Sequence, residues 1–208
     1  MRGFIKGIIV AVLLSMGSTT LFAAELGKEY RLLNPPQPVS GKKIEVLEFF
    51  YYGCSHCFDL HNPLSVWEKT IPKDVELIYV PTIFRDSMEP LARTFYALES
   101  LGMIHQMHDA VYRALMVENR ELRDETSIGE YLSTKGVDRK KFSAAYNSFS
   151  MQSKVTRARQ MVRGYGVGGT PTLVVDGKYM ITGLYPQDTL RVLNEVIVMA
   201  RKERSGKR

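Results

Sequence analysis

The pattern of apolar and polar positions predicts a strand, a helix and a second strand near the start of the chain. Residues 44–50 form an almost continuous apolar run rich in β-branched and aromatic side chains, which is typical of a buried strand. Apolar positions then recur at helical spacing over about 55–70, and residues 74–80 alternate again. This order and spacing predict a βαβ unit whose two strands pair in parallel. Residues 30–33 are expected to add an edge strand ahead of it.

A long helical region follows, because the apolar period stays near 3.6 residues from Ser87 to Arg163. Capping residues divide this region into several helices. The expected N-caps are Ser87, Ser127 (in a capping box with Glu130) and Asp138. In the helix after the last of these caps, Phe142, Tyr146 and Phe149 are expected to share one apolar face.

Strand character returns near the end of the chain. Residues 172–175 are apolar, and Asp176-Gly177 predicts a type I′ turn into a partner strand over 178–182. Pro186 suits the first turn of a last helix. The predicted order is therefore βαβ, a helical insertion, then ββα, which makes the fold α/β.

The first residues have the features of a secretory signal. Arg2 and Lys6 precede an apolar segment over 7–16, which is too short to be a comfortable membrane span, and the small residues Ala23 and Ala24 follow. We predict a signal peptide over 1–23 and an exported mature chain; whether cleavage follows Ala23 or Ala24 stays open.

Charge and cysteine content narrow the function. The net charge of +6 falls to +4 without the two basic residues of the signal, since 26 basic and 22 acidic residues remain. Much of the excess lies in residues 201–208, where no aromatic residues interleave, so we expect a solvated helix end and no nucleic-acid surface. Two cysteines are too few for a disulfide framework in an exported protein.

Those two cysteines lie where the predicted strand over 44–50 ends and the helix after it begins. A helix N-terminus favours negative charge, here a thiolate on Cys54. Cys57 lies one turn inside, so the outer sulfur can attack a disulfide and the inner one can resolve the mixed disulfide. His56, when protonated, is expected to favour the Cys54 thiolate. The alternative is that His56 is an ordinary helix residue.

A Cys-x-x-Cys pair also occurs in zinc and iron–sulfur sites. Zinc needs about four ligands, usually from a second pair of cysteines or histidines. The chain has four histidines, and His105 and His108 lie one helical turn apart in the insertion, where exposed or half-buried helix positions account for them better. We therefore expect neither a metal nor an organic cofactor.

A second piece of a site lies far along the chain, at Gly168-Gly169-Thr170-Pro171. A proline before a strand can simply end a loop. In a chain that carries Cys-x-x-Cys after its central strand, Thr170-Pro171 opening the hairpin is a much stronger indication of a redox site.

Together these residues resemble the DsbA-type thiol:disulfide oxidoreductases of the bacterial periplasm. The resemblance rests on the strand leading to Cys54-Ser55-His56-Cys57, on the helical insertion and on Gly169-Thr170-Pro171, and it covers essentially the whole mature chain. It implies a thioredoxin fold with an inserted all-helical domain. The expected division is 24–86 for the first part of that fold, 87–163 for the helical domain and 164–208 for the second part.

The resemblance also implies roles. Cys54 is the expected nucleophile and Cys57 the resolving thiol of a redox-active disulfide, with Pro171 a cis-proline beside it. The backbone of Thr170 is expected to hold substrate in a strand-like manner. Glu48 matches a buried acid that assists proton transfer; the alternative is a strand carboxylate satisfied by a lysine or water.

Two residues depart from the family pattern. Ser55 stands where proline is usual, and Thr170 where several members have valine. The dipeptide between the cysteines tunes the redox potential, so the strength of this oxidant stays open, and both changes allow a narrower or different range of substrates.

The predicted function is that of a monomeric periplasmic oxidase from a Gram-negative bacterium, which introduces disulfide bonds into exported proteins with free thiols. The resemblance implies reoxidation by a DsbB-type membrane quinone oxidoreductase. Two alternatives stay open. One is a disulfide reductase or isomerase, although such proteins more often dimerise through an added domain, for which we expect no room ahead of Ile44. The other is a peptide-binding chaperone with an incidental disulfide.

Overall fold

A five-stranded mixed sheet forms the centre of the molecule. The computed structural model describes residues 24–206, and its strands are β1 (Arg31–Leu32), β2 (Ile44–Phe50), β3 (Val75–Pro81), β4 (Thr172–Val175) and β5 (Tyr179–Thr182). Their order across the sheet is β1-β5-β4-β2-β3. β2 pairs with β3 in parallel, whereas β4 runs antiparallel to both β2 and β5. The predicted βαβ unit, edge strand and C-terminal hairpin are confirmed.

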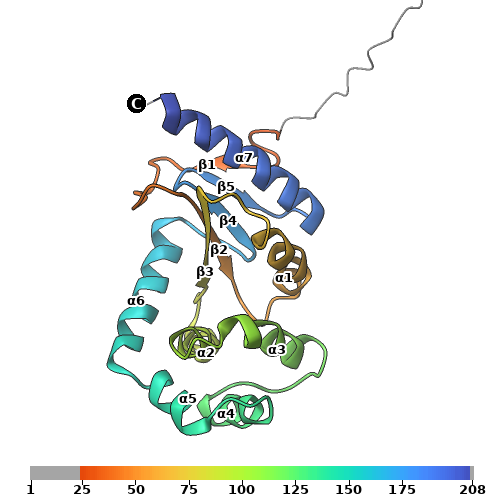
Figure 1. The fold of residues 1–208 in the computed structure, drawn as a ribbon, viewed down its shortest axis with the longest axis vertical. Coiled ribbons are helices and arrows are strands. Elements are labelled where there is room, and N and C mark those ends of the chain that lie inside the picture. The colour runs from red at the N-terminus through yellow and green to blue at the C-terminus, as the bar shows by residue number, and fades with distance from the viewer. Residues whose placement is uncertain (1–23, 207–208) are drawn as a thin grey trace, which may run out of the picture.

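The helices form two groups (Figure 1). They are α1 (Ser55–Glu68), the 3₁₀ turn η1 (Asp86–Met88), α2 (Glu89–Ser100), α3 (Ile104–Met116), α4 (Glu125–Thr134), α5 (Arg139–Tyr146), α6 (Phe149–Gly164) and α7 (Pro186–Gly206). α1 and α7 lie beside the sheet, α2 to α5 gather at its other end, and α6 runs back to the sheet. A helical block inserted between β3 and β4 is confirmed.

The central strand β2 contributes to three separate cores. Val46 packs with α1 and α7 on one face of the sheet, and Leu47 and Phe49 pack with the end of α6 on the other. Phe50, at the end of the strand, packs into the core of the inserted helices together with Cys57. Because the alternating side chains of β2 are buried on both faces, its sequence is almost continuously apolar. The strand therefore ends at the junction of sheet and helices.

Two predicted caps are wrong in detail. Ser87 lies inside η1, and the N-cap of α2 is Met88. α4 begins earlier than predicted: Asp124 is its N-cap and accepts a hydrogen bond from the Ser127 N–H at 2.8 Å. Ser127 takes the third helical position, because the Asp124 carboxylate satisfies the free N–H there. The predicted cap at Asp138 is confirmed, since its side chain accepts from the Lys141 N–H.

The prediction for Phe149 is also wrong. α5 ends at Tyr146, and Ser148 adopts the extended backbone of an N-cap, so Phe149 starts a new helix. Its side chain is 97% exposed and takes no part in a core. A break of two residues between α5 and α6 rotates Phe149 away from the apolar face that Phe142 and Tyr146 share.

Smaller features follow local chemistry. Pro81 ends β3 although it lacks an N–H, which an edge strand tolerates. Asp176 and Gly177 both have positive φ, 53° and 64°, as a type I′ turn requires. Pro186 opens α7 as predicted.

Among the described residues, no helix has the length and hydropathy needed to cross a membrane. The predicted signal peptide over 1–23 lies outside those residues.

Candidate active site

Cys54 lies at the turn between β2 and α1. Its backbone is extended (φ −109°, ψ 119°), and it is the N-cap of the helix. The Cys54 N–H donates to the Tyr51 carbonyl at 3.0 Å, which closes the turn. At Gly53 a Cβ atom would come within 2.5 Å of the Tyr51 ring, so a side chain there would displace that ring. The two thiols are free: Cys54 is half-buried, and Cys57, one turn along, is completely buried.

The surroundings of Cys54 stabilise its thiolate. A hydrogen bond from the Cys57 thiol is the largest cause, and the Thr170 side chain and the backbone N–H groups of Cys57 and His56 add to it. Against the opposing effect of burial, these donors lower the pKa of Cys54 to about 5. The helix N-terminus thus acts as the sequence predicts, through its unpaired N–H groups.

The surroundings of Cys57 do the reverse. Burial raises the pKa of Cys57 far above its ordinary value, and the hydrogen bond to Cys54 and the charge of Glu48 act in the same direction. At neutral pH the inner thiol therefore keeps its proton while the outer one loses it. That asymmetry suits an attacking outer sulfur and a protonated inner one.

Sheet pairing brings the second piece of the site to Cys54. β4 runs antiparallel to β2 with Thr172 opposite Phe49, so the start of β4 lies beside the end of β2. The Cys54 sulfur lies 3.3 Å from the Thr170 carbonyl oxygen, although 116 positions separate them in the chain. The Thr170–Pro171 peptide bond is cis. The Thr172 hydroxyl donates to the Gly169 carbonyl at 2.8 Å and holds the loop in place.

A groove of about 410 Å³ opens beside Cys54; we call it the active-site groove. It is lined by His56, Asp59, Leu60, Gly169, Thr170, Pro171, residues 182–186 and Thr189. His56 lies at its edge with a side chain that is 78% exposed, its Nδ1 atom 3.9 Å from Asp59 Oδ2. Leu184 and Tyr185, from the loop between β5 and α7, were not expected to take part. Tyr185 is 80% exposed, and an aromatic residue between a glycine and a proline was the available signal.

Glu48 lies beneath the cysteines and is almost completely buried. In the register of the sheet it pairs with Tyr79 on β3 and Leu173 on β4. Burial is the main cause that raises the pKa of Glu48 to about 8, and the negative charges of Glu68 and Cys54 contribute. The charges that act on this carboxyl group are acidic, and no lysine is among them. Neither Tyr79 nor Glu68 was predicted from the sequence to belong to the site.

The histidines of the insertion differ from the prediction. His105 is exposed, but His108 is buried, because its ring packs against Phe50 and Tyr112 and its Nδ1 atom lies 2.7 Å from the Tyr52 hydroxyl. The prediction that His108 is an exposed or half-buried position is therefore wrong. Over residues 24–206, no cluster of three histidine, cysteine, aspartate or glutamate side chains is arranged to hold a metal ion.

Comparison with known proteins gives consistent results. The sequence profile described as the DSBA-like thioredoxin domain matches residues 45–193. The chain is 35% identical over 210 residues to the thiol:disulfide interchange protein DsbA of Pseudomonas aeruginosa, a match that covers 97% of this chain and 98% of that one. Its identity to the DsbA of Bordetella pertussis is 38% over 197 residues, covering 90% and 94%.

The fold is similar as well. The crystal structure of Pseudomonas aeruginosa DsbA matches with a TM-score of 0.83 at 35% identity, over 87% of this chain and 96% of that one. The predicted thioredoxin fold with a helical insertion is confirmed.

Proposed function

The chain belongs to the DsbA-type family of thiol:disulfide interchange proteins, and from this premise we propose that Cys54 and Cys57 are its redox-active pair and that it works as an oxidase. The observation that carries the proposal is the contrast between the two thiols: Cys54 is the half-buried N-cap of α1, 3.3 Å from the Thr170 carbonyl oxygen, whereas Cys57 is completely buried one turn inside. A thiolate on Cys54 stabilises the reduced protein, so the disulfide form gives up its bond readily.

The exchange has two steps. A substrate thiolate attacks Cys54, the Cys54–Cys57 bond breaks, and its electron pair goes to the Cys57 sulfur, which takes up a proton. The second substrate thiol, once deprotonated, attacks the substrate sulfur of the mixed disulfide and releases Cys54 as a thiolate. Two electrons pass from substrate to protein. Cys54 is a good leaving group because its thiolate is stabilised, and no metal or organic cofactor takes part.

Glu48 is the proposed proton donor and acceptor for Cys57. It is buried below the cysteines, and its charge acts on Cys57. With a pKa of about 8 it is mostly a neutral acid at pH 7, so it can give a proton to the Cys57 sulfur as the disulfide opens.

The active-site groove is the proposed site for the substrate chain. Thr170 offers backbone groups beside Cys54, so an extended segment can add to this edge as a strand would. The exposed ring of Tyr185 and the side chain of Leu184 supply apolar surface along the groove. The proposed substrates are exported proteins with free thiols. His56, at the groove's edge, is proposed to help stabilise Cys54.

Further parts of the proposal concern cellular context and organisation. The protein acts in the periplasm after removal of residues 1–23, as a monomer, and a DsbB-type membrane quinone oxidoreductase reoxidises it. The thioredoxin fold occupies 24–86 and 164–208, and residues 87–163 form the helical domain. The position of α2 to α6 between β3 and β4 supports this division.

Equilibration against a series of glutathione buffers tests the direction of the reaction. We expect a reduction potential near −120 mV, as for a strong oxidant. A value near −270 mV would make the protein a reductase, and a value near −180 mV would favour an isomerase.

A further inference from the structure

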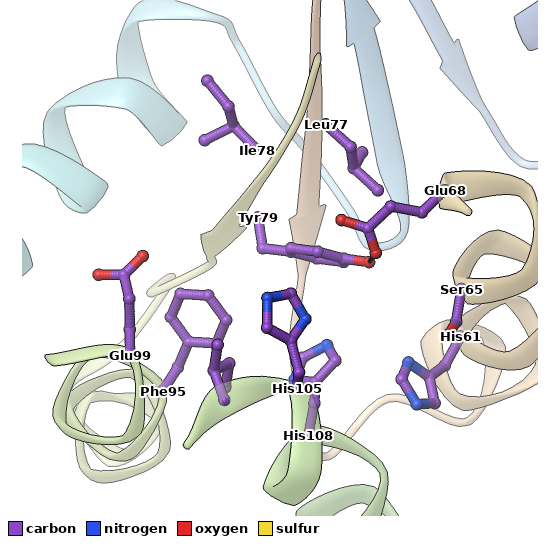
Figure 2. Close-up of a pocket in the computed structure, with 11 residues that line it drawn as sticks. His61, Ser65, Glu68, Leu77, Ile78, Tyr79, Phe95, Glu99, His105 and His108 are labelled. Atoms are coloured by element: carbon purple, nitrogen blue, oxygen red, sulfur yellow. Dashed lines mark hydrogen bonds between the residues drawn. The ribbon is translucent and has the colours of Figure 1, made fainter. Parts of the chain in front are cut away.

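Figure 2 shows the residues that line a second cavity, which we call the rear cavity. Its volume is about 390 Å³, and it lies between β3, α1, α2 and α3. It shares no lining residue with the active-site groove. The exposed side chains of Glu99 and His105 belong to its wall, so it is in contact with solvent.

Cys57 and Glu48 line neither cavity. Cys57 is completely buried and Glu48 is 2% exposed. The reaction nevertheless requires Cys57 to gain a proton when the disulfide opens and to lose it when the disulfide re-forms. Proton transfer between Glu48 and solvent therefore needs side chains that carry it.

Tyr79 connects Glu48 with the rear cavity. In the parallel register of β2 and β3 the two residues are paired, which places their side chains next to each other on the same face of the sheet. The Tyr79 hydroxyl donates to Glu68 Oε2 at 2.9 Å, and Tyr79 and Glu68 both line the cavity. Figure 2 shows the Tyr79 side chain reaching from β3 to the Glu68 carboxylate on α1.

A second buried polar contact reaches the same cavity. The Tyr52 hydroxyl lies 2.7 Å from His108 Nδ1, and His108 lines the cavity. His108 is 6% exposed, and its Nε2 atom has no hydrogen-bond partner among the described residues. A buried nitrogen of this kind requires a polar partner, and a water molecule in the hollow that it lines would supply one. The His108 ring packs against Tyr79, so the rear cavity offers a polar site for water close to that tyrosine.

We propose that protons reach and leave Glu48, and through it Cys57, by way of Tyr79, Glu68 and the rear cavity, with Tyr79 as the residue that positions this relay. The proposal rests on the proposed roles of Cys54, Cys57 and Glu48. It places the exchange of electrons at the groove and the exchange of protons on a separate part of the surface.

The Tyr79 hydroxyl donates its hydrogen bond to Glu68, and this direction favours proton transfer outward from Glu48. During reoxidation the Cys54 thiolate attacks an oxidising disulfide such as oxidised glutathione, which releases one thiolate. Cys57 then loses its proton to the Glu48 carboxylate, attacks the Cys54 sulfur and expels the second thiolate. Glu48 passes its proton to the Tyr79 oxygen as Tyr79 gives its own to Glu68, which releases it to water. In substrate oxidation the same groups act in reverse order.

The groups that face Glu48 are all acids. The ionisable side chains with which it interacts electrostatically are Cys54 at the N-cap of α1, Cys57 and Glu68 on α1, Tyr52 after β2, Tyr79 on β3 and Tyr112 on α3. Among them Glu68 is the half-buried carboxylate in the cavity wall, so it is the member of this group that connects the relay with solvent.

The test compares Tyr79→Phe and Glu68→Gln with the wild type and with Tyr179→Phe. Tyr179 is a matched control, because it is also a strand tyrosine bonded to a helix glutamate, Glu203, at 2.6 Å, and it lies in neither cavity. Reoxidation is followed by stopped-flow fluorescence from pH 5.5 to 9. Oxidised glutathione is held at concentrations where the rate no longer rises, so that attack by Cys57 limits it.

We expect Tyr79→Phe to slow this step by at least about tenfold, which is less than the roughly 10²–10⁴-fold that a positioned general acid or base contributes. Its equilibrium constant with glutathione should stay within about twofold of the wild type, and added imidazole should restore part of the rate. Glu68→Gln should slow the same step and shift its pH profile, and Tyr179→Phe should change neither.

A wild-type rate for Tyr79→Phe across the whole pH range would overturn the route. Equal slowing of Tyr179→Phe would also overturn it, because a general destabilisation of the fold by the loss of a tyrosine–glutamate hydrogen bond would then explain the effect. If Tyr79→Phe does not fold, Glu68→Gln decides, since this side chain is only half-buried. If the wild type does not exchange with glutathione at all, it is the proposed redox pair that fails.

Discussion

Cys54 and Cys57 are the same residue type one helical turn apart, and the molecule surrounds them with opposite chemistry. Cys54 accepts hydrogen bonds from the Cys57 thiol, from Thr170 and from backbone N–H groups, and its pKa falls to about 5. Cys57 faces the core of the inserted helices and the charge of Glu48, and its pKa rises. The comparison shows that the proposed activity depends on the difference in pKa between the two thiols. That difference arises because the junction of the sheet and the inserted helices gives each thiol a different environment.

The largest expected effect comes from removing one side of this comparison. Cys54→Ser should abolish disulfide exchange with a reduced peptide, because the attacked sulfur and the stabilised leaving group are lost together. Cys57→Ser is the matched control: its Cys54 thiolate should still attack a disulfide-bonded form of the peptide, expel one peptide thiolate and accumulate as a mixed disulfide, because no second thiol is present to resolve it. Mass spectrometry after acid quenching distinguishes the two. A Cys54→Ser protein that still promotes substrate folding at full activity would favour the chaperone alternative.

Glu48→Gln should raise the stability of the protein above neutral pH. The pKa of Glu48 rises from 4.5 to about 8 in the folded protein, so only the folded state holds this proton between those values. Stability therefore falls as pH rises through this window, and the neutral amide removes the loss. We expect a gain of roughly 2 to 4 kcal/mol at pH 8.5 and almost none at pH 4.

Urea unfolding of the reduced protein at both pH values measures this effect. Glu45→Gln, on the same strand but only half-buried, is the control and should give a clearly smaller gain. Equal gains from both variants would mean that the burial of Glu48 does not raise its pKa more than that of Glu45.

The reduced protein should be more stable than the oxidised one, and the gap should depend on pH. The folded pKa of Cys54, about 5, is far below the unfolded value of about 8.5. This stabilisation is complete above about pH 8.5 and is lost as pH falls through about 5. Cys57 adds no slope in that window, because its thiol is protonated in both states. Parallel denaturant melts at pH 7.5 and pH 4.5 measure the gap; a constant gap would contradict the thiolate assignment.

The smallest expected effect concerns the groove. Tyr185→Ala should raise the KM for a peptide substrate by about two- to fivefold with little change in kcat, because an exposed ring contributes about 0.5–1 kcal/mol to a contact. Phe149→Ala is the control: this ring is even more exposed but lies outside the groove. Equal effects of the two changes, or none from Tyr185→Ala, would remove the groove from substrate binding.

Local patterns were enough to predict the elements that carry the cysteines. The bounds of β2 and β4, the start of α1 and the turn at Asp176-Gly177 follow from short-range periodicity and turn chemistry. The cap at Ser127 was wrong because another polar residue nearby, Asp124, caps the helix in its place. The cap at Ser87 was wrong because a 3₁₀ turn precedes α2, so the helix begins after Met88 without a side-chain cap. Phe149 was misplaced for a similar reason, since a short break between helices leaves little trace in the apolar period.

The sequence by itself determined that an attacking thiol would lie at a helix N-terminus after a buried strand, because those preferences act over a few residues. Only the tertiary structure decided what surrounds the second thiol. The placing of Tyr79 beside Glu48, the burial of His108 and the contact of Cys54 with Thr170 all join segments distant in the chain. Such contacts arise from strand pairing and helix packing, and no local pattern encodes them.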